Sequence, residues 1–209
     1  MTDKKDFYLK EPINRYLKDL SARTIVPGGG SASAVCAAIG TALNLMVINY
    51  TFKEGESLAD SDMMIVAKAQ QEETLERLSK LIDEDCRVFS ELMEAIQKKE
   101  DAQKKYIAAS KVPMKICHEC HASMGIAAFI SKSGNRNLIS DVGCAGHTLR
   151  AAFDSARLNV EINLARIEDR SFVDQMQADL ADLVEGFKSA EQEIEINVEN
   201  VIQEGKKSA

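Results

Sequence analysis

The chain lacks features that mark several classes of protein. Its 209 residues include 26 lysines and arginines against 33 aspartates and glutamates, so the formal net charge is −7 at pH 7. Because no basic excess exists to neutralise phosphates, we expect no nucleic-acid partner. The first ten residues carry charges throughout and contain no apolar export segment. The number of cysteines, five, is odd and does not indicate a disulfide framework, so we expect reduced thiols and a cytoplasmic location.

The sequence also lacks alternating β-branched runs long enough for a strand, and no repeat or low-complexity linker divides it. Its apolar residues, 45% of the chain, recur at the three- and four-residue spacing of helices. The helices that we expect cover 11–22 (with Ile13, Leu17 and Leu20 on one face), the uncharged run up to Phe52, a long segment carrying Leu75 to Ile96, Ser110 to Ser131 with Pro113 in the first turn, Ser140 or Asp141 to Leu164, and 171–202. The prediction is one all-α domain over residues 1–209, a single-domain bundle of about six helices.

A glycine-rich stretch, Pro27-Gly28-Gly29-Gly30-Ser31, precedes a run that has no charged residue up to Phe52. Glycines let another group approach the backbone closely, and free N–H groups at a helix start can bind an anion or a polar ligand. The simpler alternative is a loop that only begins a buried helix. No strand precedes the glycines and no lysine follows them, which argues against a phosphate-binding P-loop.

The uncharged run over 24–52 is long enough to cross a bilayer. It contains Asn44, Asn49 and many alanines, and few of the leucines and phenylalanines typical of a lipid-facing helix. We therefore expect a buried central helix packed on all sides, and no membrane partner. Small residues are also frequent in the helix that ends at Leu164. Because a monomeric bundle rarely needs two such helices, we expect a partner subunit to complete the packing.

Asp85 interrupts the apolar seam of its helix between Ile82 and Phe89. A lone buried carboxylate is costly, so it is paired, protonated or placed in a polar pocket. A buried acid with a shifted pKa is a candidate general acid or base; the alternative is a structural ion pair. Asp83 lies off the seam, where solvation is expected.

Asn159 and Asn163 lie four residues apart and extend a stripe of small residues on one helix face. Two amides on a packed face indicate hydrogen bonds to a ligand, across an interface, or between helices within the fold. Asn49 is a similar case near the end of the central helix. Asp141, at a helix start, is most simply a capping acid.

The segment Cys117-His118-Glu119-Cys120-His121 matches the pattern of haem c attachment. Such attachment normally accompanies export, and no second Cys/His pair is evident for a zinc site. Cys117, Cys120 and His121 fall with Met124 on the inner face of the predicted helix. We expect a core stripe and no metal. The lone His147 is expected to pack.

Several blocks of the sequence, in order, resemble the cyclodeaminase/cyclohydrolase family of folate enzymes. They are Pro27 to Ala34 with Met46 to Thr51, Leu81 to Phe89 with Met93 to Ala95, Val112-Pro113, and Gly134 to Asn137 with Ser140 to Gly143 and Leu158 to Leu164. The resemblance covers about Leu17 to Val173.

This resemblance implies an all-helical homodimer and a tetrahydrofolate derivative as small-molecule substrate. Members of the family either hydrolyse 5,10-methenyltetrahydrofolate to the 10-formyl form or cyclise 5-formiminotetrahydrofolate with loss of ammonia. Neither reaction requires a metal or redox cofactor, so none is expected beyond the substrate. Because the chain has no sequence for the formiminotransferase domain of the bifunctional relatives, we favour the cyclohydrolase, with the cyclodeaminase as the alternative.

The implied site combines acids with amides and glycines. Asp85 or Asp83 is expected as the acid/base and cation stabiliser, and Asp141 as a second carboxylate. The substrate-binding residues expected are Pro27, Gly28, Gly29, Gly30, Ser31, Asn49, Thr51, Lys53, Asn135, Asn159 and Asn163. The glycine backbone is expected to lie against the flat pterin or a glutamate carboxylate at a subunit boundary.

The chain departs from the family pattern after Thr51. A lysine-rich stretch usually follows there, and only Lys53 remains in this chain. If those lysines attract the glutamate tail of folate, tail binding is weakened. Glu161 stands where a basic residue is common. These departures keep a further alternative open, a non-catalytic folate-binding or degenerate relative.

Overall fold

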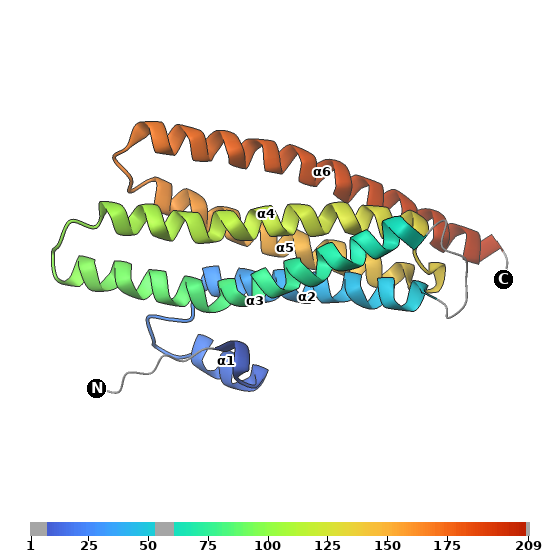
Figure 1. Cartoon of the computed structure of the whole chain (residues 1–209), viewed down its shortest axis with the longest axis horizontal. Helices are drawn as coiled ribbons and strands as arrows, with labels where there is room; N and C mark the ends of the chain where they lie inside the picture. Colours follow the sequence, from blue (N-terminus) through green and yellow to red (C-terminus); the bar gives the residue numbers. More distant parts are fainter. Residues whose placement is uncertain (1–7, 53–60, 208–209) are drawn as a thin grey trace.

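The computed structural model describes residues 8–52 and 61–207, and every regular element in them is a helix. The elements are the 3-10 helix η1 (Tyr8–Lys10), α1 (Ile13–Leu20), α2 (Gly29–Thr51), α3 (Ser61–Gln97), α4 (Gln103–Ser133), the 3-10 helix η2 (Arg136–Leu138), α5 (Ile139–Leu164) and α6 (Arg170–Lys207). Figure 1 shows the long helices α2 to α6 side by side, with α1 on the outside of the bundle. The prediction of an all-α bundle of about six helices is confirmed for the described residues.

Helix α2 is the central helix, in contact with α3, α4 and α5. Small residues let α5 approach closely, since a Cβ on Gly40 would lie 2.7 Å from Leu149 Cγ and 3.2 Å from the Ala145 carbonyl oxygen. By length and composition alone α2 could cross a membrane, and in the bundle half of its apolar window is buried. The prediction that this helix is packed on all sides does not hold for a single copy of the chain, because large residues of α2 are exposed. Ile39 is 50% exposed and Tyr50 66% exposed.

Helix α1 forms where the spacing predicts it, but its buried side is different. Ile13 and Leu17, expected on the inner face, are exposed, whereas Tyr16 is buried. The hydroxyl of Tyr16 donates to Ser31 Oγ at 3.1 Å, and the main-chain N–H of Tyr8 donates to Asp83 Oδ1 at 2.7 Å. These bonds fasten the N-terminal segment to α2 and α3. The buried phenol therefore sets which face of α1 points inward.

Helix α4 begins earlier than the sequence predicts. It starts at Gln103, whose N–H donates to Asp101 Oδ1, and Ser110 is an interior residue whose hydroxyl donates to the Ile107 carbonyl. Pro113 was predicted to mark the first turn, where a missing N–H costs nothing. Instead Pro113 lies inside the helix, where it leaves the Ala109 carbonyl without a helical donor. That carbonyl accepts a hydrogen bond from Asn163 on α5.

A fully buried polar cluster joins α2, α3 and α4 in the core. Ser123 Oγ donates to Gln71 Oε1 at 2.8 Å and lies 3.0 Å from Thr41 Oγ1. The Asn44 amide nitrogen donates to Gln71 Oε1 and to the Ser123 carbonyl oxygen. Removing a buried hydroxyl that bonds several groups lowers the free energy of unfolding more than removing an exposed one. The groups that it bonded stay buried without a hydrogen-bond partner, and water cannot replace it.

We predict that Ser123→Ala lowers the free energy of unfolding by about 1–3 kcal/mol, measured by urea denaturation. The control is Ser155→Ala on α5, whose exposed hydroxyl bonds only the Ala151 carbonyl of its own helix. That variant should differ from the parent by less than about 0.5 kcal/mol. Equal effects of the two substitutions would contradict a stabilising role of the cluster.

Candidate active site

A small cavity lies at the N-terminal end of α2, where four helices meet. It has a volume of about 90 Å³ and is lined by Gly28, Gly29 and Gly30 of the α2 start, Asp85, Val88 and Phe89 of α3, Ala109 of α4, and Asn159, Ile162 and Asn163 of α5. The sequence-predicted residues that meet here are the three glycines, Asp85 and both asparagines. The structure therefore brings one acid, two amides and the glycine stretch together in one place.

Gly30 lies against the carboxylate of Asp85. A Cβ at position 30 would lie 2.2 Å from Asp85 Oδ1 and 2.6 Å from its Cγ, far closer than a carbon atom tolerates. Position 30 requires glycine for a steric reason, because any side chain there would collide with the Asp85 carboxylate of α3 where it contacts the first turn of α2. The first turn of a helix presents unpaired N–H groups and a partial positive charge, which favour a carboxylate.

The environment of Asp85 nevertheless favours its neutral form. Burial raises the pKa of its carboxyl from 3.8 to about 6, and a hydrogen bond from the main-chain N–H of Ser31 opposes the rise. A pKa near 6 leaves the carboxylate ionised at neutral pH while keeping it able to return a proton. Among the described residues that line this cavity, Asp85 carries the carboxylate. A carboxyl with such a pKa is a candidate general acid or base.

The two asparagine side chains are held by their own donors. Asn163 Nδ2 donates to the carbonyl oxygens of Asn159, at 2.8 Å, and Ala109, at 3.0 Å. Asn159 Nδ2 donates to the Ser155 carbonyl at 2.8 Å. Among the described residues, none donates to the Oδ1 atom of either amide. The two asparagines and Asp85 therefore offer hydrogen-bond acceptors, which suit a ligand edge rich in N–H groups or in positive charge.

The rim of the cavity is apolar and open. Phe89 is exposed and Ile162 is 62% exposed. Leu158, one turn before Ile162 on α5, is also exposed. Phe89 was predicted as a core residue of α3, and neither Ile162 nor Ala109 was predicted in the site. Helical spacing locates an apolar stripe but does not say which of its members lies at the edge of a pocket.

Two expected residues, Asp83 and Ser31, lie close in sequence to residues of the cavity but do not line it, and both have structural partners. Asp83 accepts the Tyr8 N–H, and burial raises the pKa of its carboxyl while that bond opposes the rise. Asp83 was expected to be solvated, but it holds the N-terminal segment instead. Ser31 is fully buried and bonded to Tyr16, and Pro27 is buried at the start of α2.

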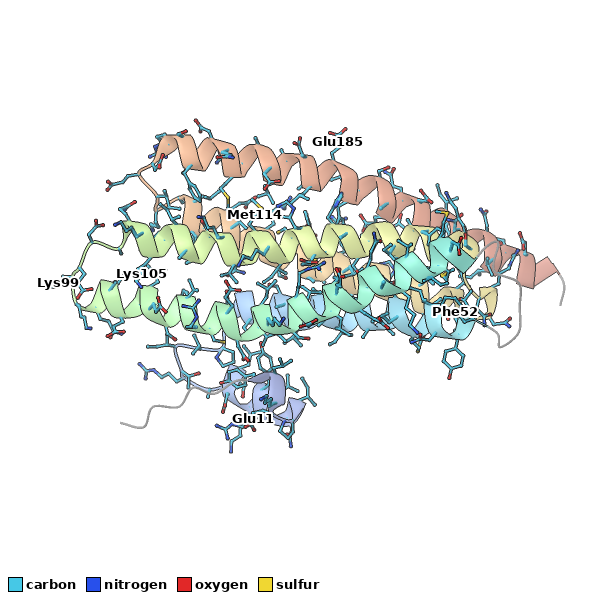
Figure 2. The ribbon with its side chains drawn as sticks, viewed as in Figure 1. Glu11, Phe52, Lys99, Lys105, Met114 and Glu185 are labelled. Carbon is cyan, nitrogen blue, oxygen red and sulfur yellow. The ribbon has the colours of Figure 1, made fainter. Side chains whose placement is uncertain are left out.

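Four other expected residues within the described ranges lie toward the other end of the bundle, namely Asn49, Thr51, Asn135 and Asp141. Figure 2 shows the two ends of the bundle, with Phe52 near one end and Lys99 and Lys105 near the other. On α5, Asp141 and Asn159 are eighteen positions apart, which corresponds to about 27 Å along the helix. Thr51 Oγ1 accepts the Asn135 N–H at 2.9 Å, so these two residues join the α2 end to the α4–α5 connection. Asn49 is exposed nearby, and Lys53 lies outside the described residues. One copy of the chain does not bring these residues to Asp85.

The cysteines and histidines of α4 point in different directions. Cys117 and Cys120 are fully buried in the core with Met124, as predicted. His118 bonds Asp179 of α6 at 2.9 Å, and His121 lies beneath Gly186, where a Cβ would approach its Nε2 to 2.5 Å. Within the described ranges, no three His, Cys, Asp or Glu side chains are arranged to hold a metal ion. Burial raises the pKa of the Cys117 thiol to about 12, which disfavours the thiolate that a metal would need.

Fold and site together define an α-helical bundle in which the carboxylate of Asp85 lies against the N-terminus of α2 within a small cavity. Comparison with known families then identifies it further. The model of the family described as formiminotransferase-cyclodeaminase matches residues 12–182. The chain belongs to this family.

Individual relatives agree with that assignment. The chain is 32% identical over 187 residues to a methenyltetrahydrofolate cyclohydrolase of Methylorubrum extorquens, covering 83% of this chain and 89% of the relative. It is 28% identical to the formimidoyltransferase-cyclodeaminase of Gallus gallus, of which it spans 35%. Its fold matches the crystal structure of a formiminotetrahydrofolate cyclodeaminase from Thermotoga maritima with a TM-score of 0.88 and 26% identity, covering 92% of this chain and 98% of that one.

We predict that Gly30→Ala lowers the catalytic efficiency of this protein at least about tenfold, because the added Cβ displaces the Asp85 carboxylate from the α2 start. The measurement is kcat/KM with 5,10-methenyltetrahydrofolate and with 5-formiminotetrahydrofolate. The matched control is Gly125→Ala on α4, where an added Cβ meets nothing within 4 Å. Similar losses in both variants would show that the close approach at Gly30 has no special role.

Proposed function

We propose that this protein is a methenyltetrahydrofolate cyclohydrolase, which hydrolyses 5,10-methenyltetrahydrofolate to 10-formyltetrahydrofolate. The observation that carries the proposal is the partly buried Asp85 carboxyl, with its pKa raised to about 6, in a cavity that is also lined by the Asn159 and Asn163 amides. The substrate carries a cationic amidinium bridge between N5 and N10. A carboxylate beside that bridge stabilises the cation and can move the protons of the reaction. The identity to the M. extorquens cyclohydrolase supports this choice.

In the proposed reaction Asp85 acts first as a base and then as an acid. Its carboxylate takes a proton from a water molecule as the oxygen attacks the bridging carbon, giving a neutral tetrahedral intermediate. The protonated Asp85 then donates that proton to N5 as the bond between N5 and the carbon breaks. The hydroxyl proton of the new formyl group on N10 is lost to solvent. The bridge is already an activated electrophile, so the proposal includes no cofactor beyond the folate substrate, and we place the reaction in the cytoplasm.

The amides and the apolar rim fit the remainder of the substrate. Asn159 and Asn163 present acceptor oxygens to N–H groups of the pterin, and Phe89 and Ile162 provide an apolar surface for its flat ring. A cavity of about 90 Å³ admits the edge of the ring and the one-carbon bridge, so the glutamate tail extends outside it. Of the two candidate acids in this region, Asp85 takes the catalytic role because Asp83 is already bonded to Tyr8.

The proposal includes a homodimer built on the exposed side of α2. Ile39 and Tyr50 are large exposed residues of a helix that has no charge over its 23 residues. A contiguous apolar face of this kind is typical of an interface between subunits. A dimer would also explain the predicted residues that lie far from Asp85 in their own chain. In it, residues of one copy could join the site of the other, namely Asn49, Thr51, Asn135 and Asp141.

We predict that Ile39→Glu shifts the protein from dimer toward monomer in sedimentation velocity at micromolar concentration, because it places a charge in the apolar face. The control is Ile196→Glu on α6, an equally prominent exposed isoleucine that lies away from α2. A wild-type protein that sediments as a monomer would refute the dimer.

The cyclodeaminase reaction is the second candidate function, and the fold match to the T. maritima cyclodeaminase supports it. In that reaction N10 attacks the formimino carbon and ammonia leaves, so Asp85 would protonate the leaving nitrogen. Loss of 5,10-methenyltetrahydrofolate absorbance faster than its spontaneous hydrolysis identifies the cyclohydrolase. Ammonia release from 5-formiminotetrahydrofolate without that acceleration identifies the cyclodeaminase. Binding of folate with neither activity identifies a non-catalytic relative.

We predict that Asp85→Asn reduces kcat at least about a hundredfold while the fold is retained, because an amide of the same shape cannot accept or return the proton. In the wild type, kcat/KM should fall as the pH drops below about 6, where the carboxylate becomes protonated. The control is Asp141→Asn, in which the pH dependence near 6 should persist. Wild-type turnover in Asp85→Asn would overturn the assignment.

The same substitution should stabilise the protein. The pKa of Asp85 is about 6 in the folded state and near 3.8 when unfolded, so between these values the folded state binds more protons and stability falls as the pH rises. Removing the charge should increase the free energy of unfolding by about 1–3 kcal/mol at pH 7 and by little at pH 4. Urea denaturation at both pH values measures the difference. A gain at pH 4 equal to that at pH 7 would show that the buried charge is not its cause.

A further inference from the structure

Pro113 lies inside α4, where proline is ordinarily unfavourable. A proline nitrogen carries no hydrogen, so the carbonyl four residues earlier, that of Ala109, cannot receive its usual helical hydrogen bond. Pro113 and Ala109 are both buried, and a buried carbonyl without a donor is costly. The helix continues through this point to Ser133, so another group must serve the Ala109 carbonyl.

That group is the side chain of Asn163 on α5. Its Nδ2 donates to the Ala109 carbonyl oxygen at 3.0 Å and also to the Asn159 carbonyl oxygen at 2.8 Å. The two N–H bonds of the amide are thus both used, which determines the orientation of the amide plane. Its Oδ1 is then the free end, and Asn163 lines the same cavity as Asp85 and Ala109.

We propose that Pro113 is a positioning residue of the active site, which acts by leaving the Ala109 carbonyl free to hold the Asn163 amide. The held amide keeps Oδ1 toward the ligand as an acceptor for an N–H group of the pterin. This inference rests on the proposed folate function. With an N–H at position 113, the Ala109 carbonyl would gain a helical donor that competes with Asn163. The amide could then rotate and present a donor where the ligand also has a donor.

The test is Pro113→Ala, assayed with 5,10-methenyltetrahydrofolate. We expect KM to rise about three- to tenfold, the worth of one well-placed hydrogen bond, with a smaller change in kcat because Asp85 is untouched. The melting temperature should stay the same or rise, since alanine is the better residue inside a helix. A loss of substrate affinity in a protein that is at least as stable separates positioning from a general structural role. Pro113→Ser, which also restores the N–H, serves as the second variant if the first fails to fold.

A double variant and a matched control sharpen the result. In the Asn163→Ala background, Pro113→Ala should leave KM unchanged, because the side chain through which the proline acts is gone. Asn197→Ala removes another interhelical amide bonded to α4, from Asn197 Nδ2 to Ser131 Oγ at 2.8 Å, away from the cavity. That variant should keep the wild-type KM. A KM increase from Pro113→Ala that is the same with and without Asn163 would overturn the proposal.

An activity-independent measurement follows the amide itself. The side-chain NH₂ signals of Asn163, assigned by their loss in Asn163→Ala, should exchange slowly with solvent in the wild type and faster in Pro113→Ala. Unchanged exchange would overturn the proposal whatever the kinetics. If the wild type neither binds nor converts either folate substrate, the proposed function fails, while the exchange measurement still decides whether Pro113 orders Asn163.

Discussion

The close approach of Asp85 to the first turn of α2 is the contact on which the site depends. It brings an acid from α3 against the N–H groups of another helix, and it exists because Gly30 has no side chain to block it. The helix end attracts the negative charge, whereas burial disfavours it. Burial is the larger effect and raises the pKa of the carboxyl to about 6. A carboxyl balanced in this way is suited to giving and taking protons near neutral pH.

The surrounding helices hold this contact in place by hydrogen bonds that are individually ordinary. Tyr16 reaches Ser31 from α1, Tyr8 engages Asp83, and Asn163 serves the carbonyl that Pro113 leaves free. Each of these bonds pairs polar groups that are at least partly buried. Stability and function are therefore linked in this protein. The bonds that complete the fold also orient the side chains that line the cavity.

The polar core cluster around Ser123 and the exposed face of α2 illustrate two further uses of uncharged residues in this chain. In the core, hydroxyls and amides bond one another across three helices. On the outer face, small and apolar residues leave a surface without charge. The first specifies how α2, α3 and α4 pack, and the second is the surface on which we place a partner copy.

The sequence by itself determined the all-α class and the extents of most helices, and it singled out Asp85, the glycines and the two asparagines, which the structure brings into one cavity. Helical spacing is a local property, and a carboxylate on an apolar seam stands out within one segment. The tertiary structure alone decided that Asp83 binds the N-terminal segment, that Asn135 meets Thr51, and that Phe89 and Ile162 form a rim of the cavity. It also decided the place of Pro113, because a proline inside a helix is tolerated only when a residue distant in sequence supplies the missing donor. Such pairings depend on which helices meet, and no local pattern encodes them.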